Sequence, residues 1–339
     1  MTVDELELED EQTEQTTRWQ RLATGSTTWI IVILAGMIVV FSVMEPDSFA
    51  TVNNARNVAT NAAILLVIAV GMTFVIITAG IDLSVGSVLV FSGVVSAKAM
   101  NGMDGDGWDV IIVGLVVALA CGLGWGSLNG VLITKARVPP LIVTLGTLGM
   151  ALGLALIITD GVDVREVPSR LVTSIGVGRL FDQIPWLVVI AVAVAVVFAV
   201  CLTATRFGRH TYAIGSNDEA ARRAGINVDR HLIAVYAISG GLAGLAGFMS
   251  LARFATTTIG GHSTDNLQAI AAVVLGGTSL FGGVGTVLGT VVGVFIPAVL
   301  QNGFVIVGVE AFWRDVAVGA VLIAAVYLDQ LRRRTQYRD

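Results

Sequence analysis

The chain has 339 residues, of which 55% are hydrophobic and only 13% are charged. An ordinary soluble domain carries about 25% charged residues, so a water-soluble globule of this composition would leave too much apolar surface facing water. The formal net charge of −5 is unevenly placed, because residues 4–14 contain seven acidic residues and no lysine or arginine. The composition therefore excludes an ordinary soluble domain and indicates an integral membrane protein.

Ten apolar segments predict an all-α, polytopic bundle of transmembrane helices. A helix needs about 20 mostly apolar residues to cross the hydrocarbon core of a bilayer. In chain order the candidates are residues 28–45, 60–78, 84–100, 109–133, 140–158, 185–204, 232–251, 266–281, 284–303 and 313–331. The third and eighth are short and rich in glycine, which leaves open whether they are continuous, broken or re-entrant.

Three regions follow from this reading. Residues 1–27 form an acidic tail that we expect to be disordered, because its like charges repel one another. Residues 28–331 form the transmembrane domain, and residues 332–339 form a basic tail. With the N-terminus in the cytoplasm, thirteen of the 20 basic residues lie in inside segments, so the charge bias predicts that both termini are cytoplasmic.

Two glycine-rich segments share a Gly-x-x-Leu-x-x-Gly pattern, at residues 80–86 and 277–283. Each stands between two predicted spans and is followed by a Val-Leu step. Transporter folds often contain internal repeats, although chance is an equal explanation in a chain so rich in glycine and leucine.

The segment 205–231 is the longest inside loop, and it contains a predicted short helix at 217–225. Ser216 or Asn217 is a good N-cap, and Glu219 stands in the first turn, where a carboxylate complements the helix dipole. Gly225 is a suitable C-terminal stop. A plain connector does not need an alanine face flanked by complementary charges, whereas a docking element does. The predicted docking residues are Asn217, Glu219, Ala220, Ala221, Arg222 and Gly225.

The pattern Glu-Ala-Ala-x-x-x-Gly at 219–225 resembles the coupling motif of ABC importer permeases. The chain lacks the Ile-x-Leu-Pro end of the maltose-type branch. Further segments resemble the branch that carries ribose, xylose, arabinose and galactose, and together they extend the resemblance from residue 28 to residue 331. These segments are 78–87, 128–130, 138–146 and 276–283.

The resemblance implies the permease subunit of an ATP-driven monosaccharide importer in a bacterial inner membrane. Its expected partners are a second permease chain, identical or paralogous, a cytoplasmic ABC ATPase, an extracytoplasmic sugar-binding protein and the lipid bilayer. The chain has no Gly-x-x-x-x-Gly-Lys-Ser/Thr phosphate loop, so ATP and Mg are expected to be used by the partner. We expect no catalytic residue, cofactor, metal site or nucleic-acid partner in this chain.

Polar residues inside apolar spans are candidates for the substrate path, because they cost free energy there. Neutral amides and hydroxyls suit a sugar, whose hydroxyl groups exchange hydrogen bonds with them. The alternative is interhelical hydrogen bonding, worth about 0.6 kcal/mol on average. The path candidates are Asn61, Asn129, Thr144, Gln301 and Asn302.

Asp82 stands just before the third predicted span and Ser84 begins it. We expect Asp82 or Ser84 to cap this helix rather than to gate the path or contact sugar.

Three rival functions are weaker on the sequence alone. A permease of the same superfamily for branched-chain amino acids, urea or nucleosides would share the glycine-rich spans but is expected to have different loop signatures. An ion-coupled carrier predicts carboxylates at mid-span, and none is clear. A membrane enzyme predicts an acid–base pair or a metal cluster, and the histidines and cysteines show no ligand spacing.

Overall fold

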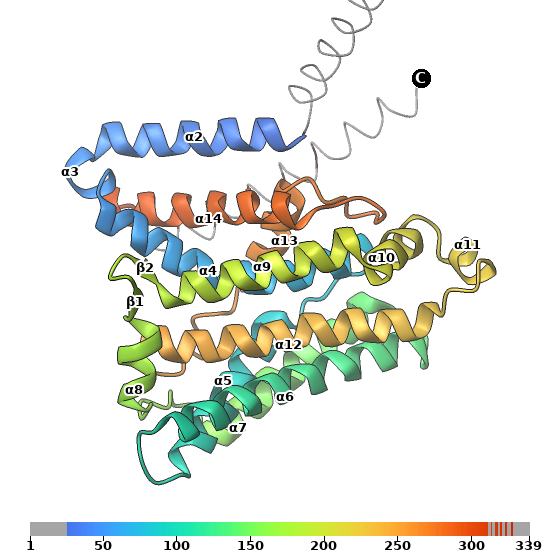
Figure 1. The fold of residues 1–339 in the computed structure, drawn as a ribbon, viewed down its shortest axis with the longest axis horizontal. Helices are drawn as coiled ribbons and strands as arrows, with labels where there is room; N and C mark the ends of the chain where they lie inside the picture. The colour runs from blue at the N-terminus through green and yellow to red at the C-terminus, as the bar shows by residue number, and fades with distance from the viewer. Residues whose placement is uncertain are drawn as a thin grey trace, which may run out of the picture.

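The computed structural model describes residues 26–310 and a few scattered residues beyond them. These are Trp313, Val316, Ala317, Gly319, Ala320, Ile323 and Tyr327. The described chain is a stack of helices that run side by side (Figure 1). The longer helices are α2 (Ser26–Met44), α4 (Val52–Ile77), α5 (Val85–Asn101), α6 (Trp108–Thr134), α7 (Pro140–Thr159), α9 (Trp186–Ala204), α12 (Val228–Phe254), α13 (Asp265–Leu275) and α14 (Val287–Val307).

Short elements connect these helices. They are α3 (Pro46–Phe49), α8 (Ser169–Leu171), the π-helical turn η1 (Val172–Gly176), α10 (Arg206–Ser216) and α11 (Asp218–Arg223), with strands β1 (Arg179–Leu180) and β2 (Ile184–Pro185). The two strands pair antiparallel in a two-stranded ribbon.

The helical architecture confirms an all-α, multi-pass bundle. Six described helices, α4, α6, α7, α9, α12 and α14, are long and apolar enough to cross a membrane. Shorter apolar helices occupy three more of the predicted spans, within α2, α5 and α13. The tenth predicted span, 313–331, lies mostly outside the described residues, as do most of the acidic tail at 1–27 and all of the basic tail at 332–339. The number ten therefore stays a prediction.

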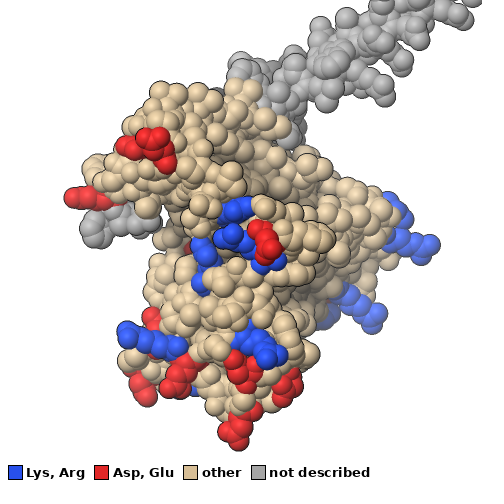
Figure 2. Space-filling model, turned by 60° about the vertical axis from the view of Figure 1, so that its left-hand side comes forward, with Lys and Arg blue, Asp and Glu red and all other residues tan. Residues whose placement is uncertain are grey.

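Helix α4 occupies the centre of the bundle and α9 its edge. The most apolar stretch of α4 is 94% buried, whereas that of α9 is 22% buried although it is the more hydrophobic of the two. Such an exposed apolar helix is stable in lipid and unstable in water. Figure 2 shows charged side chains gathered at the ends of the bundle, with uncharged residues covering the surface between them.

Helices α6 and α12 are in backbone contact along a row of small residues. Along α6, Ala118, Gly122, Gly126 and Gly130 recur every four residues and so share one face. A Cβ atom on Gly122 would lie 2.2 Å from the carbonyl oxygen of Gly240. Small residues at this spacing allow membrane helices to approach closely, which compensates for the absence of a hydrophobic driving force in lipid.

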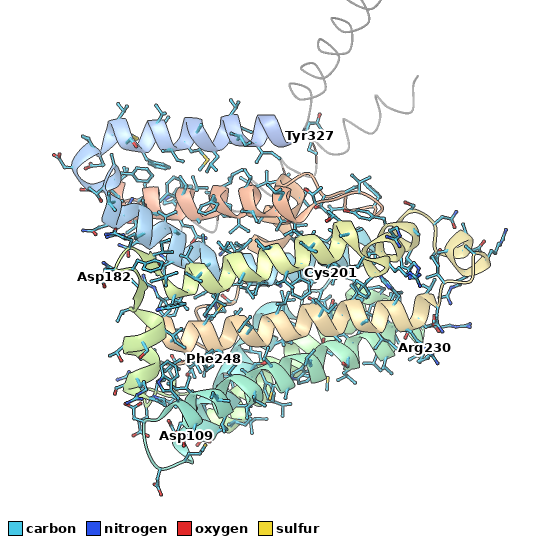
Figure 3. All side chains as sticks on the ribbon, viewed as in Figure 1. Asp109, Asp182, Cys201, Arg230, Phe248 and Tyr327 are labelled. Carbon is cyan, nitrogen blue, oxygen red and sulfur yellow. The ribbon has the colours of Figure 1, made fainter. Side chains whose placement is uncertain are left out.

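The short helices α10 and α11 lie at one end of the bundle, while α3, α8 and the strands lie at the other (Figure 1). At the first end, ion pairs join the loop after α6 and helix α11 to the start of α12. Lys135 Nζ lies 3.1 Å and Arg222 Nη2 2.8 Å from the Asp229 carboxylate. Figure 3 shows Arg230 at this end and Asp109 and Asp182 at the opposite end. The loops predicted to lie inside thus gather together.

Two elements differ from the predictions. The eighth span, predicted over 266–281, is helical only over α13, whose eleven residues are too few to cross the bilayer. Gly277, Gly282 and Gly283 adopt positive φ angles, which end the helix and open an irregular segment at 276–286. The predicted repeat segments therefore both form non-helical entries, to α5 and to α14.

The loop 205–231 contains two helices where one, at 217–225, was predicted. Helix α11 is shorter than expected, and α10 precedes it. Two glycines in α10 serve close packing. A Cβ on Gly215 would lie 1.7 Å from the carbonyl oxygen of Ile77, and one on Gly208 would lie 1.8 Å from that of Leu202.

Candidate functional site

A cavity of about 350 Å³ lies among α4, α13, α14 and the loop before α13. This volume is at the lower end of the range for small-molecule sites. We call it the amide cavity, after its polar lining of Asn61, His262, Asp265, Gln268, Gln301 and Asn302. Phe254 adds an aromatic ring, and within the described chain no lysine or arginine lines the cavity. The lining therefore suits a neutral, hydroxyl-rich molecule better than an anion.

Hydrogen bonds hold the amides of this lining in place. Gln301 Nε2 donates to Gln268 Oε1 over 2.8 Å, which joins α14 to α13. Asn302 and Asn54 exchange two hydrogen bonds of 2.9 Å, which join α14 to the start of α4. Three predicted path residues, Asn61, Gln301 and Asn302, thus lie around one cavity.

Sequence reasoning missed His262, Asp265 and Gln268. The structure places His262 between two partners, with Nε2 2.8 Å from Ser250 Oγ and Nδ1 2.7 Å from Asp265 Oδ2. The short spacing of His262 and Asp265, three residues apart at a helix start, is the only signal in the sequence that could have linked them.

The other two predicted path residues lie elsewhere. Asn129 is fully buried, and its Nδ2 donates to Ser84 Oγ over 2.9 Å. Thr144, also fully buried, donates to the Pro140 carbonyl oxygen one turn earlier, over 3.0 Å. Neither lines the amide cavity. Both pack near the start of α5, where Thr144 is bonded within α7 and Asn129 is bonded through Nδ2 alone. The buried Oδ1 of Asn129 has no hydrogen-bond partner among the described residues.

Asp82 is 1% exposed and accepts three hydrogen bonds. Its Oδ1 accepts from the backbone N–H of Ser84 at 3.0 Å and from Ser84 Oγ at 2.6 Å. Its Oδ2 accepts from Ser239 Oγ on α12 at 3.1 Å. A side chain that accepts from an N–H group two residues later forms an Asx turn. Asp82 therefore fixes the entry to α5 and ties it to α12.

Helix α11 presents one face to the protein and one to its surroundings. Asn217 Oδ1 accepts from the N–H of Ala220 over 2.9 Å, as expected of an N-cap. Ala221 is 4% exposed and packs with Ile214 and Val228. The Glu219 side chain is 76% exposed, and its carboxylate lies 3.2 Å from Arg223. Glu219 is thus available to a partner.

Helix α10 contacts both irregular segments of the bundle. The Tyr212 hydroxyl donates to the Gly285 carbonyl oxygen over 2.7 Å, and burial raises the pKa of this phenol, so that it stays protonated. The N–H of Gly283 donates to the Ile77 carbonyl oxygen over 2.9 Å, next to Gly215. The end of α4, the 276–286 segment and α10 therefore form one contact.

The apolar bundle, the amide cavity inside it and the exposed helix at one end define a membrane permease. A family model described as "Branched-chain amino acid transport system / permease component" matches residues 54–326. The chain belongs to this family, and within it to the permeases of ribose-type ABC sugar importers. It is therefore a multi-pass membrane transport protein.

Three relatives illustrate the similarity. The ribose import permease of Bacillus subtilis is 38% identical over 87% of this chain and 89% of its own length. The D-allose transport system permease of Escherichia coli is 35% identical over 88% and 90%, respectively. The galactose/methyl galactoside import permease of E. coli is 33% identical over 89% and 94%. No solved structure matches the chain.

Proposed function

We propose that the chain is the translocating subunit of an ATP-driven monosaccharide importer, and that the amide cavity is part of its path. The observation that carries this proposal is the lining of neutral amides without a described lysine or arginine. An amino acid carries a carboxylate, for which the lining offers no lysine or arginine. Arg253, which is not part of the lining, donates to Asn61 Oδ1 over 3.5 Å. The relatives, whose names specify ribose, allose and galactose, also favour a sugar over a branched-chain amino acid or a nucleoside.

The path in this proposal includes Asn61, Gln301 and Asn302. Their side chains surround one volume, and each is a neutral donor and acceptor. We assign Asn129 to interhelical support and Thr144 to the support of α7, since their hydrogen bonds are made within the bundle.

Coupling to a cytoplasmic ATPase is assigned to α10 and α11. Glu219 is exposed for docking, whereas Ala221 anchors α11 and Tyr212 joins α10 to the 276–286 segment. The partner hydrolyses ATP with Mg, and this chain binds neither. In this proposal, α10 and α11 connect the exposed Glu219 with the irregular 276–286 segment inside the bundle.

The assembly contains a second permease chain, identical or paralogous, and an extracytoplasmic binding protein in a bacterial inner membrane. Both termini lie in the cytoplasm, at the same side as α11. The basic residues of the loops that gather at the α11 end support this orientation.

The test is transport by the complex reconstituted in proteoliposomes with its ATPase and binding protein. We expect ATP-dependent uptake of at least one of D-ribose, D-allose and D-galactose, and none of leucine or uridine. The double variant Glu219→Ala, Gly225→Ala is expected to insert normally but to lose sugar uptake, since it removes the exposed carboxylate and strains a residue at φ +85°.

Asp104→Ala is the matched control, because Asp104 is an exposed acid in the loop between α5 and α6. It should leave uptake unchanged. Unchanged ATP-dependent uptake by the double variant contradicts the coupling assignment, and uptake of leucine or uridine alone contradicts the sugar assignment.

A further inference from the structure

We infer that Asp265 is a specificity-determining sugar contact in the amide cavity and that His262, anchored by Ser250, is its positioning residue. This inference rests on the proposed function. It adds that the Asp265 carboxylate is the group that recognises one particular hydroxyl of the sugar. The three side chains come from the end of α12, the following loop and the start of α13.

The arrangement is a chain of two short hydrogen bonds leading to the cavity. Ser250 is 3% exposed and lies behind His262, which lines the cavity together with Asp265. The Asp265 carboxylate is held through Oδ2, 2.7 Å from His262 Nδ1. In the described part of the chain its Oδ1 accepts no hydrogen bond. A carboxylate has about four acceptor positions, so Asp265 keeps acceptor capacity for a ligand.

The order serine, histidine, aspartate resembles that of a hydrolytic triad, but the space around it excludes that role. A nucleophile must face the volume that holds the substrate. Ser250 does not line the amide cavity. The small cavity that it does line measures about 10 Å³, which has no room for a substrate. Ser250 therefore supports His262 and, through it, Asp265, and does not act as a nucleophile.

The chemistry of the pair suits a sugar hydroxyl. A carboxylate accepts hydrogen bonds more strongly than an amide does, and a fixed carboxylate accepts them in one direction. The other polar lining groups are amides, which both donate and accept and therefore discriminate less. A site built to bind a particular hydroxyl rejects an analogue that lacks it, because the buried acceptor is then left without a partner.

The experiment compares each sugar with its monodeoxy analogues in the reconstituted complex. For D-ribose, D-allose and D-galactose, the rate of ATP-dependent uptake is measured for the parent and for each deoxy form. Asp265→Asn keeps the shape but weakens the acceptor, and we expect it to lower uptake of the carried parent sugar about tenfold. For the one deoxy analogue that lacks the contacted hydroxyl, the same variant should cause no further loss.

Two substitutions of His262 separate positioning from mere packing. The amide nitrogen of an asparagine occupies about the place of Nδ1 and can still donate to Asp265, whereas that of a glutamine occupies about the place of Nε2. We expect the preference for parent over deoxy sugar to be highest in wild type, intermediate in His262→Asn and lowest in His262→Gln. Ser250→Ala should reduce the preference, while Ser96→Ala, which alters another buried serine that bonds a backbone carbonyl, should not.

The outcomes are distinct. An equal loss for the parent and for every deoxy analogue in Asp265→Asn overturns the inference. A loss of the same size in Asp104→Asn, an exposed loop carboxylate outside the cavity, also overturns it. If wild type takes up none of the sugars, the proposed function itself fails and the inference with it. Sugar uptake by wild type with an unchanged preference in Asp265→Asn overturns the inference alone.

Discussion

The Asp82 carboxylate is buried within the bundle and is fixed by three hydrogen bonds. Its three donors come from two helices, and a fourth residue, Asn129, donates to Ser84 and extends the network to α6. A buried polar group without a partner costs about 1–3 kcal/mol. The network therefore supports a structural role for Asp82 at the entry to α5. The helix itself has no side-chain cap, because Asp82 accepts from Ser84 and not from the first turn of α5.

Replacing Asp82 distinguishes capping from gating. Asp82→Ala leaves the N–H of Ser84 and two hydroxyls without their acceptor, so we expect a clear fall in the melting temperature of the purified permease. Asp82→Asn should lose less, since its amide oxygen still accepts from Ser84. Melting followed by tryptophan fluorescence checks this. An unchanged melting temperature with abolished transport in Asp82→Ala would instead assign Asp82 to gating.

At the same scale, the sequence predicts some site residues and not others. Asp82 is conspicuous because it is an acid inside an apolar run, and Gln301 and Asn302 are conspicuous as paired amides in a span. His262 and Asp265 lie in a polar loop, where such residues are ordinary. Only the fold brings them to the cavity, because a single sequence does not state which loop folds back between α4 and α14.

Among the elements, the contact of α6 with α12 depends on the absence of side chains. A Cβ on Gly126 would lie 2.1 Å from the carbonyl oxygen of Tyr236, so any larger residue must separate the two helices. Backbone atoms cannot yield as a flexible side chain can. This contact therefore holds α6 and α12 as one unit.

Gly122 and Gly124 provide a matched test of that contact. Both are in α6, but Gly122 faces the backbone of α12, whereas a Cβ on Gly124 would meet nothing within 4 Å. We expect Gly122→Leu to prevent accumulation of folded permease, and Gly124→Leu to be tolerated. Size-exclusion chromatography of detergent extracts measures the folded fraction. Equal yields of the two variants would show that the helices do not need to touch.

Periodicity and hydropathy identify most of these elements, and they fail at two. Helix α10 was not predicted. Its two glycines, Gly208 and Gly215, are required by close backbone contacts that the sequence does not reveal. The apolar run at 266–281 was extended too far, because hydropathy does not register the positive φ angles that end α13 near Gly277. Both errors concern glycine, whose role depends on what lies next to it.

At the scale of the whole molecule, the charged ends of the bundle predict its orientation. Arg223 is exposed on α11, and Asp104 is exposed in the loop after α5, at opposite ends (Figure 1). The excess of basic residues near α11 predicts that this end faces the cytoplasm. Hydropathy and charge thus predict class and orientation, whereas the number of spans depends on broken segments that hydropathy cannot resolve.

Cysteine accessibility tests the orientation. In a chain whose Cys121 and Cys201 are replaced by alanine, we introduce Asp104→Cys or Arg223→Cys separately. A membrane-impermeant maleimide should label Asp104→Cys in intact spheroplasts, and Arg223→Cys only after permeabilisation. The reverse pattern would invert the topology and place α11 outside, where no ATPase can reach it.

The short length of α13 lets one helix contact the cavity at one end and the irregular 276–286 segment at the other. Eleven residues span about 16 Å, roughly half of the hydrocarbon thickness. One end supplies Asp265 and Gln268 to the cavity, and the other leads into the segment whose Gly285 is bonded to Tyr212. Because a helix resists stretching along its axis, we expect an axial displacement of the 276–286 segment to move this wall of the cavity. In the proposed importer, α13 thereby links α10 to the part of the path that Asp265 and Gln268 line.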